Sequence, residues 1–171
     1  MSLIYLVAGE ASGDILGARL MAALRARDAS LEFAGLGGER MAEQGLASLF
    51  DIRELALMGL LEVLPSLRRL ARRLDEAAAD IARRRPRLVV TIDSPGFTLR
   101  LAARVKALGI PVVHYVAPQV WAWRPGRVKK IAQRVDHILA LLPFEAPIFE
   151  AAGIPVTFVG HPILESETLG G

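Results

Sequence analysis

Two acidic residues stand within two residues of the end of a strand-like segment, where each could act on a polar ligand. Asp93 follows the largely apolar run Leu88–Ile92, and Glu10 follows the apolar run Leu3–Ala8 by two residues. A carboxylate at the end of a buried strand is partly withdrawn from water, so its pKa can rise towards that of a general base. Glu10 could accept hydrogen bonds from ligand hydroxyls. Either acid could instead cap the helix that follows it.

The first loop, Gly9–Asp14, lacks the glycine pattern of a dinucleotide site. It reads Gly-x-x-x-Gly rather than Gly-x-Gly-x-x-Gly, so NAD binding loses its support. Ser12 is suited to the N-cap of the following helix, and Asp14 suits the positive end of that helix dipole. We therefore expect a structural role for Asp14.

Both tryptophans of the chain, Trp121 and Trp123, lie in one loop between Pro118 and Pro125. Two indoles held between prolines form a shaped, semi-rigid wall that suits sugar rings and acyl chains. The alternative is that they plug the end of the sheet, since a buried Trp is often core. The basic residues from Arg124 onward could meet phosphate or form a solvated helix face.

The length, charge and cysteine and histidine content of the chain limit the classes of function that are open to it. The length of 171 residues allows one compact domain. A net charge of +3, mostly from Arg, is consistent with phosphate or lipid headgroups, but no basic block indicates a nucleic-acid partner. The absence of cysteine excludes disulfides, and three scattered histidines lack metal-ligand spacing, so no metal site is expected. The N-terminus lacks the features of a secretory signal, which predicts a cytoplasmic protein.

Strand-like and helix-like segments alternate along the chain, which predicts an α/β fold with a doubly wound parallel sheet. The expected strands are Leu3–Ala8, Leu31–Ala34, Leu46–Phe50, Leu88–Ile92, Pro111–Val116, His137–Leu141 and Pro155–Val159. The expected helices run to about Arg27, over Glu39–Gln44, from Pro65 or Ser66 onward, and over Phe97–Leu108, Arg127–Arg134 and Glu145–Ala152.

The long helix after Pro65 is expected to pack on the sheet through one apolar stripe, made of Leu67, Leu70, Ala71, Leu74, Ala78 and Ile81. Ligands of doubly wound sheets gather at the carboxyl ends of the strands. The corresponding loops here are Gly9–Asp14, Asp93–Phe97, Ala117–Arg124 and Gly160–Pro162.

The segment Glu54–Leu64 is too apolar for an ordinary surface turn and too short to span a bilayer. It must therefore either bury in the core or lie in a lipid interface. Basic residues on the following helix could meet anionic headgroups, namely Arg68, Arg69, Arg72 and Arg73.

Five motifs, in order and over nearly the whole chain, resemble those of lipid-A-disaccharide synthases. They are Val7–Asp14, Ala56–Leu64, Ile92–Phe97, His114–Arg124 and Leu142–Glu145. The resemblance implies the Rossmann-like N-terminal domain of a GT-B type glycosyltransferase. It further implies an inverting, metal-independent transfer without a cofactor, in lipopolysaccharide biosynthesis. A UDP-2,3-diacylglucosamine donor and a 2,3-diacylglucosamine 1-phosphate acceptor give a β-1,6 disaccharide and UDP.

Carried over residue by residue, the resemblance makes Asp93 the candidate base and Glu10 an essential acid. The candidate substrate-binding residues are Ser12, Gly13, Ser94, Pro118, Trp121, Trp123 and Arg124. The resemblance also favours the lipid interface for Glu54–Leu64, because both substrates carry acyl chains. The candidate membrane and acyl contacts are Met58, Leu60, Leu61 and Leu64.

The family pattern places an acceptor-binding domain at residues 1–160 and the start of a linker at 161–171. The donor would then bind mainly through a further domain, and the 171-residue chain alone would be inactive. The expected location is the cytoplasmic face of the inner membrane. Two alternatives stay open, a non-catalytic lipid- or phosphate-binding module and a UDP-sugar epimerase. The strongly apolar Leu55–Leu64 segment disfavours the epimerase.

Overall fold

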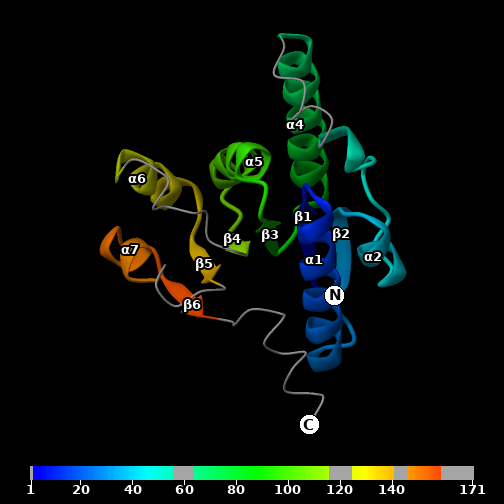
Figure 1. Cartoon of the computed structure of the whole chain (residues 1–171). Helices are drawn as coiled ribbons and strands as arrows, with labels where there is room; N and C mark the ends of the chain where they lie inside the picture. The colour runs from blue at the N-terminus through cyan, green and yellow to red at the C-terminus, as the bar shows by residue number, and fades with distance from the viewer. Residues whose placement is uncertain (1, 56–63, 116–124, 141–145, 159–171) are drawn as a thin grey trace.

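A six-stranded parallel sheet organises the chain, in the order β2-β1-β3-β4-β5-β6 (Figure 1). The computed structural model describes residues 2–55, 64–115, 125–140 and 146–158, and of 64–66 and 125–127 it describes only the backbone. The strands are β1 (Leu3–Ala8), β2 (Glu32–Leu36), β3 (Leu88–Ile92), β4 (Val112–Tyr115), β5 (His137–Ala140) and β6 (Val156–Phe158). The order reverses after β2, so the predicted doubly wound fold is confirmed.

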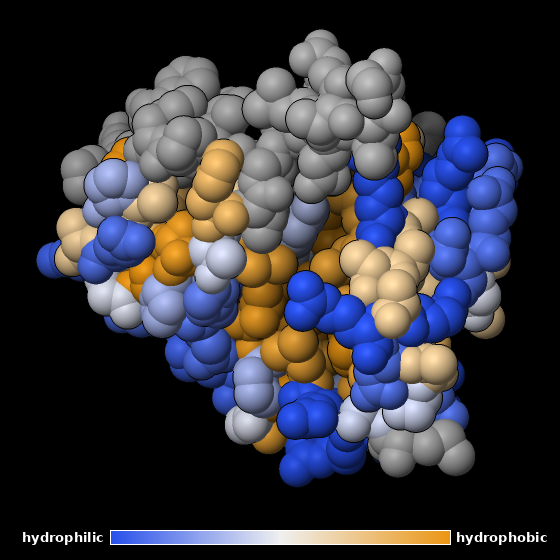
Figure 2. Space-filling view, turned by 90° about the horizontal axis from the view of Figure 1, so that it is seen from below, coloured by the Kyte–Doolittle hydropathy of each residue, from blue (hydrophilic) through white to orange (hydrophobic). Residues whose placement is uncertain are grey.

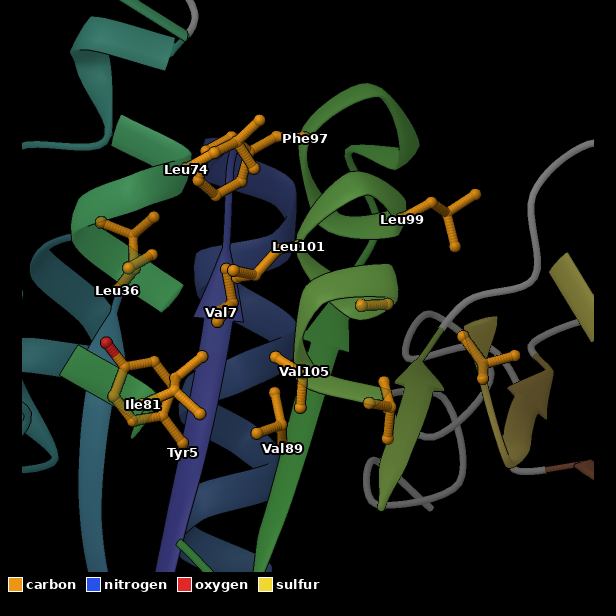
Figure 3. Packing of buried hydrophobic residues seen from close by; sticks show 14 of the residues in the cluster. Tyr5, Val7, Leu36, Leu74, Ile81, Val89, Phe97, Leu99, Leu101 and Val105 are labelled. Carbon is orange, nitrogen blue, oxygen red and sulfur yellow. The ribbon is translucent and has the colours of Figure 1, made fainter. Parts of the chain in front are cut away.

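Helices cover both faces of this sheet. They are α1 (Ala11–Arg27), α2 (Glu39–Glu43), α4 (Leu64–Arg84), α5 (Pro95–Ala107), α6 (Pro125–Arg134) and α7 (Ala146–Ala151). Alternate residues of β1 point to opposite layers: Ile4 and Leu6 join the core with α1 and α2, while Tyr5 and Val7 join the core with α4 to α7 (Figure 3). Seen from below, apolar residues accordingly gather in the middle of the molecule between hydrophilic surfaces (Figure 2).

Two of the predicted strands differ from the structure. The segment Leu46–Phe50 forms only an isolated bridge from Ser48 to Gly35, and β2 runs on to Leu36 instead of ending at Ala34. Gly35 sits inside the strand with φ of +138°, and a Cβ there would lie 1.9 Å from the carbonyl oxygen of Leu6. This glycine therefore permits the close approach of β1 rather than opening a turn.

The apolar stripe predicted for α4 holds only for the part of the helix that faces the sheet. Leu74 and Ile81 are buried, and Ala77 joins them, but Leu67 is 55% exposed and Ala71 is also exposed. The first turns of α4 extend beyond the sheet and the other labelled helices, so no described strand or helix covers that side of them (Figure 1). In the part of the chain that the structure describes, every helix is too short or too polar to cross a bilayer.

Candidate functional site

The loops after β1 and β3 meet at the carboxyl edge of the sheet, as the sequence predicted. Ala8 of β1 is paired with Ile92 of β3, so Gly9 and Asp93 follow side by side. A Cβ on Gly9 would lie 2.6 Å from the Ser94 Oγ, which leaves room for glycine only. The two loops that carry the candidate acids are thus in direct contact.

The turn that presents Asp93 is conformationally strained. Asp93 and Ser94 both adopt left-handed backbone angles, with φ of +47° and +46°. Such a conformation costs on the order of 1–3 kcal/mol for each non-glycine residue and concentrates at functional sites. Surrounding contacts must therefore hold this turn in place.

Thr98 supplies part of that support. Its hydroxyl lies 2.7 Å from the carbonyl oxygen of Asp93 and 3.0 Å from that of Ser94, and its side chain is fully buried in α5. The Asp93 N–H also donates to the carbonyl oxygen of Tyr115, at 3.1 Å. The backbone of Asp93 is therefore tied to both α5 and β4.

The Asp93 carboxylate does not cap the helix beside it. Ser94 occupies the N-cap position of α5 and makes no side-chain cap, and Pro95 begins the helix. Among the described residues, the half-buried Asp93 carboxylate has no hydrogen bond or ion pair, and the buried Ser94 Oγ has no hydrogen-bond partner. The Asp93 carboxylate thus keeps its hydrogen-bonding capacity for a ligand.

Glu10 lies at the N-cap position of α1, with an exposed side chain that makes no cap. The expected N-cap at Ser12 is wrong, because the helix already begins at Ala11; Ser12 is an exposed residue of its first turn. Gly13 is buried, and a Cβ there would lie 3.4 Å from the carbonyl oxygen of Ile92. The start of α1 therefore packs directly against the end of β3.

Asp14 does have a structural role, but on a different helix from the one expected. Its carboxylate is 5% exposed and accepts the backbone N–H groups of Gly38, Arg40 and Met41 at 2.8, 3.0 and 3.0 Å. These groups belong to the start of α2, which has no side-chain cap of its own at Gly38. Asp14 thus locks α1 to the β2–α2 connection.

A buried polar pair lies on β3 and β4 close to Asp93. The Thr91 Oγ1 is 2.8 Å from the His114 Nδ1, and both side chains are fully buried. The sequence did not single out Thr91 or Thr98. The partner of Thr91 lies on another strand, and the contacts of Thr98 depend on the left-handed turn at Asp93 and Ser94. The described residues contain no cluster of three or more His, Asp or Glu side chains that could hold a metal ion.

Several predicted contact residues lie outside the described part of the chain, namely Met58, Leu60, Leu61, Pro118, Trp121, Trp123 and Arg124. Leu64 begins α4, with only its backbone described.

Two expectations for the segment around Leu64 need correction. Leu55 is buried in the core, and Arg73 is engaged with Glu54, Glu76 and the ring of Phe50 rather than free for headgroups.

Comparison with known proteins identifies the family. A family model described as lipid-A-disaccharide synthetase matches residues 4–170. The lipid-A-disaccharide synthase of Rhodospirillum centenum is 59% identical over 167 residues, covering 96% of this chain and 42% of the relative. That of Gluconobacter oxydans is 60% identical over 163 residues, covering 95% of this chain and 39% of the relative. The chain thus spans about two fifths of the length of these relatives.

Solved structures agree on the fold at low sequence identity. UDP-GlcNAc 2-epimerase from Neisseria meningitidis, bound to UDP-GlcNAc, has a TM-score of 0.66 at 12% identity and matches 99% of this chain and 48% of its own. MurG from Acinetobacter baumannii has a TM-score of 0.60 at 15% identity and matches 95% of this chain and 46% of its own. These likenesses confirm the predicted Rossmann-like architecture.

Proposed function

The chain belongs to the lipid-A-disaccharide synthetase family, and we propose that it forms the acceptor-binding part of an inverting glycosyltransferase. The acceptor domain would span residues 1–160, and residues 161–171 would begin a linker to a donor-binding domain. The strained Asp93–Ser94 turn carries the proposal, because it holds a carboxylate without a structural partner next to the Glu10 loop. The substrates are a UDP-diacylglucosamine donor and an acylated glucosamine 1-phosphate acceptor.

In the proposed reaction Asp93 acts as the general base. A sugar hydroxyl is a poor nucleophile near neutral pH, so a positioned carboxylate must take its proton as it attacks the anomeric carbon. The new C–O bond forms on the face opposite the leaving group, and the bond to UDP breaks with its electron pair going to the diphosphate. Glu10, on the neighbouring loop, would bind acceptor hydroxyls. Arg side chains and helix N-termini of the donor domain would neutralise the diphosphate.

The test uses a full-length protein of this family that carries these residues. Incubated with both acylated substrates, it should give a β-1,6-linked disaccharide and one UDP for each product. Conversion of the UDP-sugar to an isomer without acceptor would instead indicate an epimerase. Tight acceptor binding with no turnover would indicate a binding module, and either result would overturn the proposal.

Peripheral membrane association completes the proposal. The apolar residues Met58, Leu60, Leu61 and Leu64, followed by exposed Arg68, Arg69 and Arg72 on α4, would dock on the cytoplasmic face of the inner membrane. Each basic residue near an anionic surface is worth about 1 kcal/mol.

Replacing Leu60, Leu61 and Leu64 together with Ser should release the full-length protein from anionic liposomes while leaving its melting temperature almost unchanged. Ile148→Ser serves as the control, because Ile148 is a 38%-exposed apolar residue of α7, remote in sequence from this segment. A large fall in melting temperature of the triple variant would show that these leucines belong to the core.

A further inference from the structure

A hollow of about 500 Å³ opens between the start of α1, the β2–α2 connection with α2, and the segment at residues 51–53. Its wall begins at Ala11, directly after Glu10, so it adjoins the loop of the candidate site. Small-molecule pockets in proteins usually measure about 300–1,000 Å³, so this volume is sufficient for a ligand. The lock between Asp14 and α2 fixes its two main walls against each other.

Most polar groups around the hollow already have partners within the protein. The Asp14 carboxylate accepts three backbone N–H groups, including those of Gly38 and Arg40 in the wall. The Asp51 carboxylate is bound by the Arg53 guanidinium at 2.7 to 3.1 Å. The Gly37 N–H donates to the Ser48 hydroxyl, at 3.1 Å. The exceptions are the exposed side chains of Glu39 and Arg40, of which Arg40 makes only a 3.9 Å ion pair with Glu43. A sugar or a phosphate in the hollow would depend on these two side chains.

The apolar part of the lining, in contrast, is open to solvent. Ile15 is 46% exposed, and it is one of four large hydrophobic side chains so exposed among the described residues. Ala11 and Ala42 are exposed beside it, and the buried Ile52 contributes to the same lining. Covering these surfaces would remove apolar area from water without breaking a hydrogen bond, which is what a hydrocarbon ligand does.

We propose that this hollow binds one fatty acyl chain of the acceptor. The inference rests on the proposed function, which supplies an acceptor with acyl chains and places its sugar at the neighbouring Glu10 and Asp93 loops. The segment at residues 51–53 also leads directly into the apolar segment Glu54–Leu64, so the hollow connects in sequence to the proposed membrane contact. Each methylene buried there would tighten binding about fourfold.

Ala42→Trp in the full-length protein should fill the hollow from its exposed wall without disturbing the core. We expect the KM for a long-chain acceptor to rise at least about tenfold, whereas the KM for the UDP-sugar and the turnover of a short-chain acceptor stay unchanged. Ala22→Trp, at an exposed position of α1 outside the hollow, is the matched control. An equal effect on long- and short-chain acceptors, or no effect, would overturn the assignment.

A second measurement does not depend on turnover. A long-chain fatty acid carrying a photoreactive diazirine should label the peptides that contain Ile15 and Ile52, and Ala42→Trp should abolish this labelling while Ala22→Trp preserves it. Labelling confined to other peptides would refute the acyl site even if disaccharide is formed. Labelling at these peptides in a protein that makes no disaccharide would support the acyl site and refute the proposed function.

Discussion

At the scale of single residues, the two acids of the first loop differ in burial and in hydrogen bonding. The Asp14 carboxylate is buried and accepts three backbone N–H groups, whereas the Glu10 side chain is exposed and makes no cap. A carboxylate whose oxygens are already occupied is poorly suited to a ligand. Asp14 therefore acts by fixing the walls of the site, and Glu10 is the acid of this loop that can reach a substrate.

Asp14→Ala should lower the free energy of unfolding by roughly 3 kcal/mol or more, because it leaves three backbone donors at the start of α2 without their acceptor. Urea denaturation of the chain measures the loss. Glu10→Ala is the control, since its exposed side chain makes no cap, and it should change stability by less than about 0.5 kcal/mol. Equal stability of the two variants would contradict the assigned role of Asp14.

The sequence singled out Asp93 and Glu10 as candidates because their signal is local, an acid placed after an apolar strand. The support given by Thr98 and the partners of Asp14 could not be predicted in the same way. Asp14 meets groups 24 to 27 residues further on, so its role depends on how α1 and α2 pack together. The left-handed angles at Asp93 and Ser94 also lacked a signal, since neither residue is a glycine.

At the scale of elements, a buried contact fastens α4 to the central strand β1. The Tyr5 hydroxyl donates to the Asp80 carboxylate at 2.8 Å, and Arg83 and Arg84 pair with the same carboxylate from the next turn. Burial, reinforced by Asp80, raises the pKa of the Tyr5 hydroxyl far above 10. Burial also opposes ionisation of Asp80, but its hydrogen bonds with Tyr5, Arg84 and Arg83 outweigh this and lower its pKa below 3.8.

These shifts predict how stability depends on pH. Because the folded pKa of Tyr5 exceeds the unfolded value of about 10, its contribution is complete below pH 10 and is lost as the pH rises further. Between pH 10 and 11.5 the free energy of unfolding should fall more steeply in the wild type than in Tyr5→Phe, by up to about 1.4 kcal/mol per pH unit. Urea unfolding across this range measures both slopes, and parallel curves would refute the assigned contact.

The sequence predicted most helices and strands of the described chain to within a few residues, because their apolar periods are strong. It was wrong about Leu46–Phe50, which makes a single bridge, and about the first turns of α4, where Leu67 is exposed. An apolar stripe states which side of a helix is apolar but not how far the sheet extends beneath it. The burial of Leu55 could not be predicted for a similar reason, since the core residues of its cluster come from other parts of the chain.

At the scale of the whole molecule, the residues that the structure describes form one sheet with one set of strand-end loops. Its core is covered on both faces, by α1 and α2 on one side and α4 to α7 on the other (Figure 1). The relatives are more than twice as long, with 42% of the first covered here. A nucleotide-sugar site formed by a second domain would therefore require residues beyond those of this chain.

The 171-residue chain should accordingly fold by itself but bind UDP no more tightly than millimolar. A cooperative urea transition would establish folding, and titration calorimetry with UDP would measure the affinity, with a full-length relative as the positive control. A micromolar affinity of the isolated chain would place the nucleotide on this domain. It would contradict the proposal that the donor binds to a separate domain.

The central claim, that Asp93 is the base of glycosyl transfer, is tested most directly by the turnover of Asp93→Asn in the full-length protein. The amide keeps the shape of the side chain but cannot take the acceptor proton, so we predict a fall in kcat of at least about 100-fold with a nearly unchanged melting temperature. Glu150→Gln, at an exposed position of α7, should leave kcat unchanged. Turnover of Asp93→Asn close to that of the wild type would contradict the account.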